Sequence, residues 1–153
     1  MTYISRRTFL SDSCRKASCL LFAAIGGTVL SNCDVGTNLI IINVTPVNWV
    51  VTLPLDANSP LSQVGDAIAV HYDTGKLVVA HVTQGTFTAL AGVCTHEACD
   101  ISRYETQTKQ FLCPCHATYF NAEGSPVWGA ARRPLAKYET HIENNQLKIR
   151  LQG

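Results

Sequence analysis

The chain has 153 residues, of which 46% are apolar and 15% charged, and its formal net charge at pH 7 is +1. This length leaves room for one small domain with a core of ordinary size and a leader. From Asp34 onward eight basic residues face ten acidic ones, and no basic patch points to a nucleic-acid partner. Seven cysteines are more than a protein of the reducing cytosol usually carries, so each cysteine needs a role.

The first 33 residues have the order of an export signal. Basic residues come first, and an uncharged, mostly apolar stretch runs from Ala17 to Cys33. The segment SRRTFL, residues 5–10, resembles the twin-arginine export signal. A chance arginine pair before a short buried helix is the alternative, and the Phe9-Leu10 that follows the arginines favours the signal. We therefore expect export by the twin-arginine route.

The end of this leader allows two outcomes. No Ala-x-Ala cleavage site is present, but Leu30-Ser31-Asn32-Cys33 is similar to a lipoprotein processing box and departs from it at Asn32, where a small residue is usual. Cys33 is therefore a candidate for lipidation. The other outcome is an uncleaved anchor helix, although 17 uncharged residues are near the lower limit for spanning a bilayer. Either outcome tethers the protein to the outer face of the cytoplasmic membrane.

After the leader the sequence predicts a linker and then an all-β domain over 47–153. Residues 34–46 are the linker, and the apolar run 39–42 within it is expected to form a strand, with membrane contact as the alternative. Short β-rich runs then recur between turn residues, and no long stretch has a helical period. These runs predict strands over 47–53, 67–72, 77–83, 86–91, 110–113, 136–142 and 146–151.

Two stretches between these strands gather the residues that carry chemistry. They are 94–99, CTHEAC, which we call the first ligand loop, and 113–118, CPCHAT, the second ligand loop. Together they supply two thiolates and two imidazoles, from Cys94, His96, Cys113 and His116. This is the ligand set of a Rieske [2Fe–2S] centre, in which two histidines replace two cysteines on one iron. Each loop also holds one further cysteine, Cys99 or Cys115.

A structural zinc site on the same four side chains is the main alternative. Such sites usually pair cysteines two to four residues apart before a pair of histidines, whereas each loop here mixes one cysteine with one histidine. The paired spacing also argues against two ordinary loop histidines. The other histidines, His71, His81 and His141, lie in predicted strands without ligand partners nearby in sequence, and we expect them to be structural.

On these motifs, the chain from about Val47 to Gly153 is similar to Rieske domains of the disulfide-containing subtype. The resemblance implies an antiparallel iron–sulfur β sandwich with the ligand loops at one tip and one [2Fe–2S] cluster per chain. It further implies that Cys99 and Cys115 pair to lock the two loops together, and that a third, proline-containing loop after Gly124 covers the cluster. A disulfide agrees with the export signal, because both belong to an oxidising compartment.

The resemblance also assigns tuning roles to two positions after the second ligand histidine. High-potential respiratory members carry there a serine hydroxyl aimed at a bridging sulfide and a tyrosine hydroxyl aimed at a cysteine sulfur. Thr118 stands at the serine position and keeps a hydroxyl, whereas Phe120 stands at the tyrosine position and lacks one. Hydrogen bonds to the sulfurs stabilise the reduced state, so we expect a midpoint potential in the lower part of the range of this subtype.

The tip departs from that of quinol-oxidising subunits of cytochrome bc complexes. Those subunits usually have Leu-Gly after the first histidine, where this chain has Glu97-Ala98, and Gly129-Ala130-Ala131 replaces the usual Gly-Pro-Ala of the third loop. A carboxylate entering an apolar quinol pocket would bear a desolvation cost of several kcal/mol. These departures favour a partner with a polar docking surface, although neutral drift of exposed residues would also produce them.

Three functions follow from these patterns. The first is a membrane-tethered carrier that passes single electrons between a dehydrogenase and a c-type cytochrome or similar acceptor. The second is the small Rieske subunit of a larger oxidoreductase, either a bc-type complex or an arsenite-oxidase-like molybdoenzyme. The third is a structural zinc module. The domain carries no nucleophile–base pair or nucleotide loop, so we expect no catalysis by this chain alone.

Overall fold

The computed structural model describes residues 37–151. The twin-arginine motif and Cys33 lie outside the described residues. Within 37–151 the secondary structure consists of strands and turns, which confirms the all-β prediction. No helix in this part of the chain is long and apolar enough to cross a membrane.

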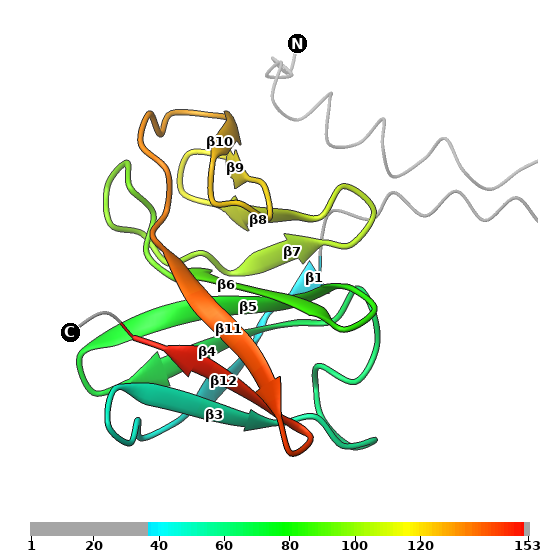
Figure 1. The fold of residues 1–153 in the computed structure, drawn as a ribbon. Coiled ribbons are helices and arrows are strands. Elements are labelled where there is room, and N and C mark those ends of the chain that lie inside the picture. Colours follow the sequence, from blue (N-terminus) through cyan, green and yellow to red (C-terminus); the bar gives the residue numbers. More distant parts are fainter. Residues whose placement is uncertain (1–36, 152–153) are drawn as a thin grey trace, which may run out of the picture. The chain divides into compact units, whose positions relative to one another are not determined.

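Within residues 37–151, twelve strands form two sheets (Figure 1). The smaller sheet is antiparallel and has the order β1 (Thr37–Asn38), β7 (Arg103–Glu105), β8 (Gln110–Cys113), β9 (Thr118–Phe120) and β10 (Pro126–Trp128). The larger sheet has the order β2 (Ile40–Asn43), β4 (Ala67–Tyr72), β5 (Gly75–Thr83), β6 (Thr86–Ala91), β11 (Lys137–Glu143), β12 (Gln146–Arg150) and β3 (Val50–Pro54). Its one parallel pair is β2 with β4. Both ligand loops are connections that begin or end in the smaller sheet.

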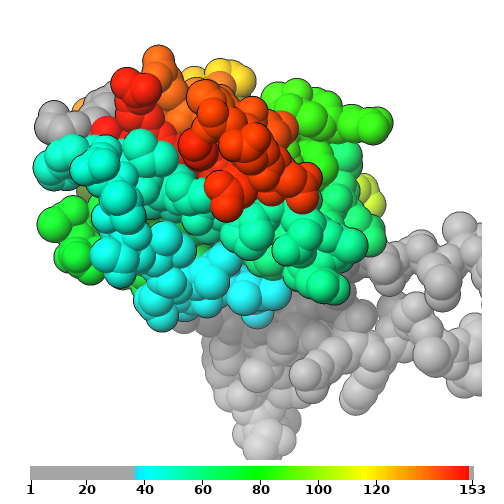
Figure 2. Space-filling model, turned by 60° about the horizontal axis from the view of Figure 1, so that its bottom comes forward, coloured from blue at the N-terminus to red at the C-terminus, as the bar shows by residue number. Residues whose placement is uncertain are grey.

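The segment expected to be a linker is partly built into both sheets. Thr37 in β1 pairs with Tyr104 in β7, and Ile40 in β2 pairs with Ile68 in β4. The apolar run 39–42 thus contributes a strand, as its composition indicated, and strand pairing begins before Val47. The described part of this segment, residues 37–46, is cyan in Figure 2 and lies on the face that also exposes the terminal hairpin of β11 and β12, drawn in orange and red. The domain is longer at its N-terminal side than the sequence suggested.

Strands β5 and β6 are buried on both faces, which explains their continuous apolar runs. On one face Leu77, Val79 and Ala89 join a core enclosed by the larger sheet, together with Leu147 and Ile149 of the terminal hairpin. On the other face a second core lies between the two sheets and includes Val78, Ala80, Leu90, Tyr104, Phe111 and Phe120. The cysteines Cys94 and Cys113 belong to this second core, so the ligand loops grow out of a rigid packed layer.

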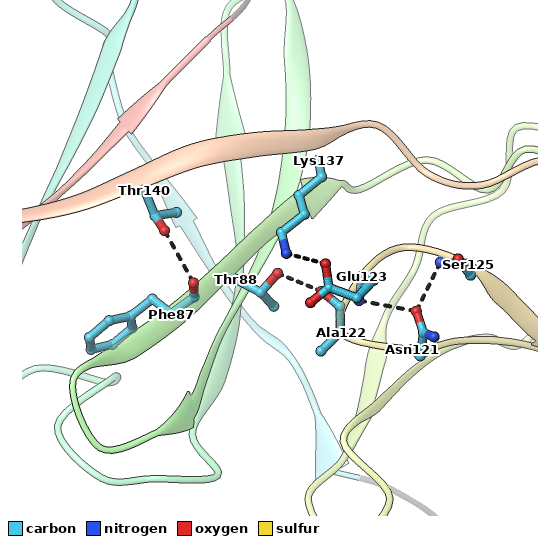
Figure 3. A network of polar contacts seen from close by, with 8 residues as sticks. All are labelled: Phe87, Thr88, Asn121, Ala122, Glu123, Ser125, Lys137 and Thr140. Atoms are coloured by element: carbon cyan, nitrogen blue, oxygen red, sulfur yellow. Dashed lines mark hydrogen bonds and ion pairs between the residues drawn. The ribbon is translucent and has the colours of Figure 1, made fainter.

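A polar network fastens the connection between β9 and β10 to the larger sheet (Figure 3). The Thr88 hydroxyl in β6 donates to the Ala122 carbonyl at 2.7 Å, and Lys137 in β11 pairs with Glu123 at 2.5 Å. The Asn121 side chain accepts the N–H groups of Glu123 and Ser125, which closes the turn. The network fixes the point from which β10 and the third loop start.

His81 has the structural role that its strand position predicted. Its side chain is buried and stacks on Phe87 with ring centroids 4.3 Å apart. Its Nδ1 lies 3.0 Å from the Leu61 carbonyl oxygen, an acceptor, so Nδ1 carries the proton of that hydrogen bond. The ring therefore ties the 56–66 connection to the core rather than serving as a metal ligand.

Candidate metal centre

The first ligand loop is closed by hydrogen bonds between its own ends. The Cys94 N–H donates to the Cys99 carbonyl at 2.8 Å, and the Ala98 N–H donates to the Cys94 carbonyl at 3.0 Å. Ala98 has a φ of 55°, a left-handed conformation that is unusual for a residue with a side chain. Such strained positions concentrate at functional sites, because the surrounding structure must hold them in place.

The second ligand loop is a tight connection between two paired strands. Cys113 ends β8 and pairs with Thr118, which begins β9, so residues 114–117 form the reversal between them. Ala117 within this reversal also has a left-handed conformation, with φ of 47°. The pairing places Cys113 in the core and His116 at the exposed end of the turn.

A disulfide joins the two loops. Cys99 of the first loop is bonded to Cys115 of the second, as the resemblance implied. The bond accounts for both extra cysteines and leaves Cys94 and Cys113 as free thiols in the described part of the chain. Because the two loops come from different strand connections, the bond fixes their relative position.

The four candidate ligands divide into a buried pair and an exposed pair. The thiols of Cys94 and Cys113 lie in the core, where the two residues are 4% and 1% exposed. The imidazoles of His96 and His116 lie at the surface, with their rings nearly perpendicular and their Nδ1 atoms 3.2 Å apart. Two nitrogen donors thus converge from different loops on one point outside the sulfurs.

The surroundings of Cys113 show how the chain handles a thiolate. Burial raises the pKa of the Cys113 thiol, and the neighbouring Cys94 thiol raises it further. The backbone N–H groups of Cys115 and His116 act in the opposite direction and lower this pKa. The turn of the second loop therefore directs amide donors at the sulfur, where they stabilise negative charge.

The donor arrangement distinguishes a two-iron cluster from a single zinc ion. A tetrahedral zinc site gathers its four ligand atoms around one centre. Among the described residues, no group of three or more donors within 4.8 Å of one another combines a thiol with an imidazole: His96 and His116 group with Glu97, and Cys113 groups with the two disulfide cysteines. Two thiols on one side and two imidazoles on the other fit a cluster in which each pair holds its own iron.

A third loop, residues 129–136, is held against both ligand loops. The Ala130 N–H donates to the Thr118 hydroxyl at 3.1 Å. Gly129 packs so closely that a Cβ there would lie 2.5 Å from the Thr118 Cα. On the other side the Thr95 hydroxyl donates to the Arg133 carbonyl at 2.7 Å. Sequence reasoning missed this second link, because nothing in the sequence relates positions 95 and 133.

Thr118 and Phe120 both lie fully buried beside the candidate ligand cysteines. Each has no exposed surface, and Phe120 belongs to the same core cluster as Cys94 and Cys113. The Thr118 oxygen accepts the Ala130 N–H, and within residues 37–151 no acceptor receives the proton of its hydroxyl. That proton is therefore available to an acceptor held between the loops.

Glu97 extends over the outer edge of the second-loop histidine. Its carboxylate oxygen lies 3.6 Å from Nε2 of His116, the ring nitrogen opposite the one that faces His96. Both side chains are exposed. The sequence identified Glu97 as unusual at this position, and the structure shows that its charge faces a ligand candidate rather than solvent alone.

Comparisons with known proteins agree with this geometry. The family model of the Rieske [2Fe–2S] domain matches residues 51–139. The iron–sulfur subunit of the cytochrome b6-f complex of Gloeobacter violaceus is 29% identical over 116 residues, which are 76% of this chain and 55% of that subunit. The Rieske iron–sulfur subunit of the cytochrome bc1 complex of Corynebacterium diphtheriae is 47% identical over 61 residues, 39% of this chain and 15% of that subunit.

A solved structure matches as well. The crystal structure of the plasma-membrane Rieske protein PetC3 from Synechocystis PCC 6803 superposes with a TM-score of 0.50 at 27% identity, covering 55% of this chain and 85% of that one. The chain covers about half of the length of the cytochrome b6-f subunit and a smaller share of the cytochrome bc1 subunit.

Proposed function

Because this chain belongs to the Rieske [2Fe–2S] domain family, we propose that Cys94 and Cys113 hold one iron of its cluster and that His96 and His116 hold the other. The observation that carries this assignment is the segregation of the donors, with the thiols in the core and the two Nδ1 atoms converging outside it. All four residues lie within the matched range, as do the disulfide cysteines.

Transfer of one electron at a time is the function that this site supports. A [2Fe–2S] cluster with two histidine ligands supplies one-electron chemistry at about −150 to +300 mV, against about −400 mV for plant-type clusters held by cysteines alone. Around it the chain provides buried thiols and backbone donors on the inner side, and two exposed imidazoles on the outer side. The exposed imidazole edge is therefore the place where a redox partner would approach.

The cellular setting that we propose is the outer face of the cytoplasmic membrane. Three features support it: the twin-arginine motif at 5–10, the candidate lipidation site Cys33, and the disulfide between Cys99 and Cys115, which is typical of oxidising compartments. One relative of known structure is a plasma-membrane protein. Fractionation of cells that produce the chain and its Arg6→Lys/Arg7→Lys variant tests the route. Wild type should reach the membrane fraction with its disulfide formed, and equal distribution of the variant would contradict the proposal.

Two kinds of redox partner are compatible with the site. Glu97 at the tip favours a carrier that meets a polar protein surface, such as a c-type cytochrome or a membrane dehydrogenase. Similarity to subunits of cytochrome b6-f and bc1 complexes favours the second candidate, a subunit of a larger oxidoreductase. Purification from membranes in mild detergent separates the two, because a subunit would co-purify with integral partners in fixed proportion whereas a carrier would not.

The ligand assignment is tested by metal analysis and spectroscopy of the full chain. Purified protein should contain two irons and two sulfides per chain and give the electron paramagnetic resonance signal of a mixed-ligand cluster after reduction. Cys94→Ser and His116→Ala should each abolish that signal. His141→Ala removes an exposed strand histidine without touching the loops and is the matched control. The assignment would be contradicted if His141→Ala lost the signal while Cys94→Ser and His116→Ala kept it. Stoichiometric zinc in the wild-type protein would contradict it as well.

A further inference from the structure

Strand β10 and the third loop together present an aromatic and basic surface beside the ligand loops. Trp128 is 71% exposed and Val127 is 47% exposed, although both belong to strand β10. With Arg132 they line a surface hollow of about 400 Å³. We call the four residues Val127, Trp128, Arg132 and Arg133 the third-loop patch. Large exposed apolar side chains with arginine beside them are typical of protein–protein contacts, in which tryptophan and arginine contribute most of the binding energy.

The two arginines of this patch have no carboxylate partner among the described residues. Of the eight lysines and arginines in the described residues, four lie within 4.0 Å of a carboxylate: Lys76, Lys137, Lys148 and Arg150. Arg132 and Arg133 do not, and they are the only adjacent pair of cations within 37–151. Within the part of the chain that the structure describes, Arg133 has one acceptor, the Thr95 carbonyl oxygen at 3.5 Å. Most of the N–H donors of both guanidinium groups therefore remain available.

The third-loop patch adjoins the ligand loops that carry the exposed imidazoles of His96 and His116, where electrons would leave the protein. Its Arg133 is bonded to Thr95, which lies between the ligand candidates Cys94 and His96. The neighbouring Gly129 packs on Thr118 of the second loop. The carboxylate nearest the exposed imidazoles, that of Glu97, faces His116 and does not pair with either arginine. A partner seated on the patch would therefore lie next to the imidazoles.

We propose that the third-loop patch is the docking surface for an acidic redox protein, whose carboxylates pair with Arg132 and Arg133 while an apolar side chain contacts Trp128. This inference rests on the electron-transfer function proposed above and names the chemistry of the partner. Complementary charge steers such encounters and accelerates association, most strongly at low ionic strength. An anionic lipid surface is a poorer fit, because recognition of membranes by basic residues uses clusters of about four to eight cations.

The test uses the full chain with its cluster and two forms of one acceptor. Cytochrome c is used in its native, basic form and after maleylation of its lysines, which makes it acidic. Stopped-flow mixing at low and high salt gives the second-order rate constant for its reduction. The variant is Arg132→Glu, and the control is Lys109→Glu, which changes the net charge equally. Lys109 precedes β8 whereas Cys113 ends it, so this lysine lies at the far end of that strand from the ligand loops (Figure 1).

At low salt we expect the acidic acceptor to react faster than the basic one, and Arg132→Glu to slow the acidic acceptor at least fivefold, whereas Lys109→Glu changes its rate less than twofold. High salt should remove these differences. Trp128→Ser should slow the reaction at high salt as well. Equal effects of Arg132→Glu and Lys109→Glu, or faster reaction of the basic acceptor, would overturn the proposal.

Two further readouts separate the possible failures. The cluster signal and midpoint potential should be the same in wild type, Arg132→Glu and Lys109→Glu, so an altered rate reports docking. A wild-type chain without a cluster signal would refute the electron-transfer function and the docking surface together, whereas a normal signal without charge-dependent rates would refute the docking surface alone. Loss of binding to phosphatidylserine vesicles in Arg132→Glu, with unchanged electron transfer, would assign the patch to lipid instead.

Discussion

The hydroxyl of Thr118 is buried beside the candidate ligand Cys113 and has a proton to donate. Its oxygen accepts the Ala130 N–H, and its side chain has no exposed surface. Thr118→Val keeps the shape and removes the donor, so the reduced state loses about 1 kcal/mol of stabilisation, and the midpoint should fall by roughly 40 mV. Thr118→Ser keeps the hydroxyl and is the control. Redox titration of both variants measures the difference, and equal midpoints would show that the hydroxyl does not reach the cluster.

At Phe120 a substitution can add a hydroxyl near the site, whereas Thr118→Val removes one. Phe120 is fully buried in the core cluster that contains Cys94 and Cys113, and its side chain carries no hydroxyl. Phe120→Tyr should raise the midpoint by about 40 to 80 mV if the new hydroxyl donates to a cysteine sulfur. Phe111→Tyr, on the facing strand position, adds the same group elsewhere in this core and is the matched control. An unchanged midpoint in voltammetry of Phe120→Tyr would refute this explanation of the low expected potential.

Glu97 adds a charge at the outer edge of the site. Its carboxylate lies 3.6 Å from His116 Nε2, and a negative charge there opposes the addition of an electron. Because the group is exposed, solvent screens its effect, and Glu97→Gln should raise the midpoint by only about 20 to 50 mV at low salt. Glu123→Gln removes a carboxylate that pairs with Lys137 away from the histidines and serves as control. A shift of the same size in both variants would show that net charge, rather than position, is responsible.

At the scale of elements, the disulfide links two loops that the sheets alone do not join. Cys99 and Cys115 are 16 residues apart. A cross-link that closes a loop of this length lowers the entropy of the unfolded chain and so raises its free energy by about 3 kcal/mol. Cys99→Ser/Cys115→Ser should therefore lower the free energy of unfolding by roughly 2 to 4 kcal/mol and speed the loss of cluster absorbance in chelator. Loss of the cluster at the wild-type rate in this double variant would contradict the stabilising role of the disulfide.

How far the sequence predicts these elements depends on their length. Runs of four or more residues with β-rich composition predicted β2, β3, β4, β5, β6, β8, β11 and β12. Strands β1, β7, β9 and β10 have two or three residues each, which is too short for an alternating pattern to be recognised. Their existence depends on pairing partners distant in sequence, such as Tyr104 for Thr37.

The candidate site also has a part that local sequence predicts and a part that depends on contacts between distant positions. The four candidate ligands could be proposed from the sequence because each loop carries its own cysteine and histidine at a fixed spacing. The contacts of Thr95 with Arg133 and of Glu97 with His116 join positions from different connections, so local sequence holds no signal for them. The donor segregation that argues against zinc also became visible only in the folded chain.

At the scale of the whole molecule, one sandwich arranges the site from inside to outside. The core between the sheets holds the cysteines, the disulfide and the third loop fix the ligand loops, and the imidazoles lie at the surface beside the aromatic and basic patch. This order separates the two requirements of a redox protein, a protected cofactor and an accessible edge. It also means that changes on the outer side should alter partner reactions more than protein stability.

The most direct test of the central claim is a redox titration of the full chain, followed by electron paramagnetic resonance. A cluster held by Cys94, His96, Cys113 and His116 should develop its reduced signal with the slope of a one-electron couple. Its midpoint should lie between about −150 and +300 mV, toward the lower part of what the disulfide-containing subtype covers. A signal that titrates near −400 mV, as for all-cysteine ligation, or a silent protein that contains zinc, would contradict the account.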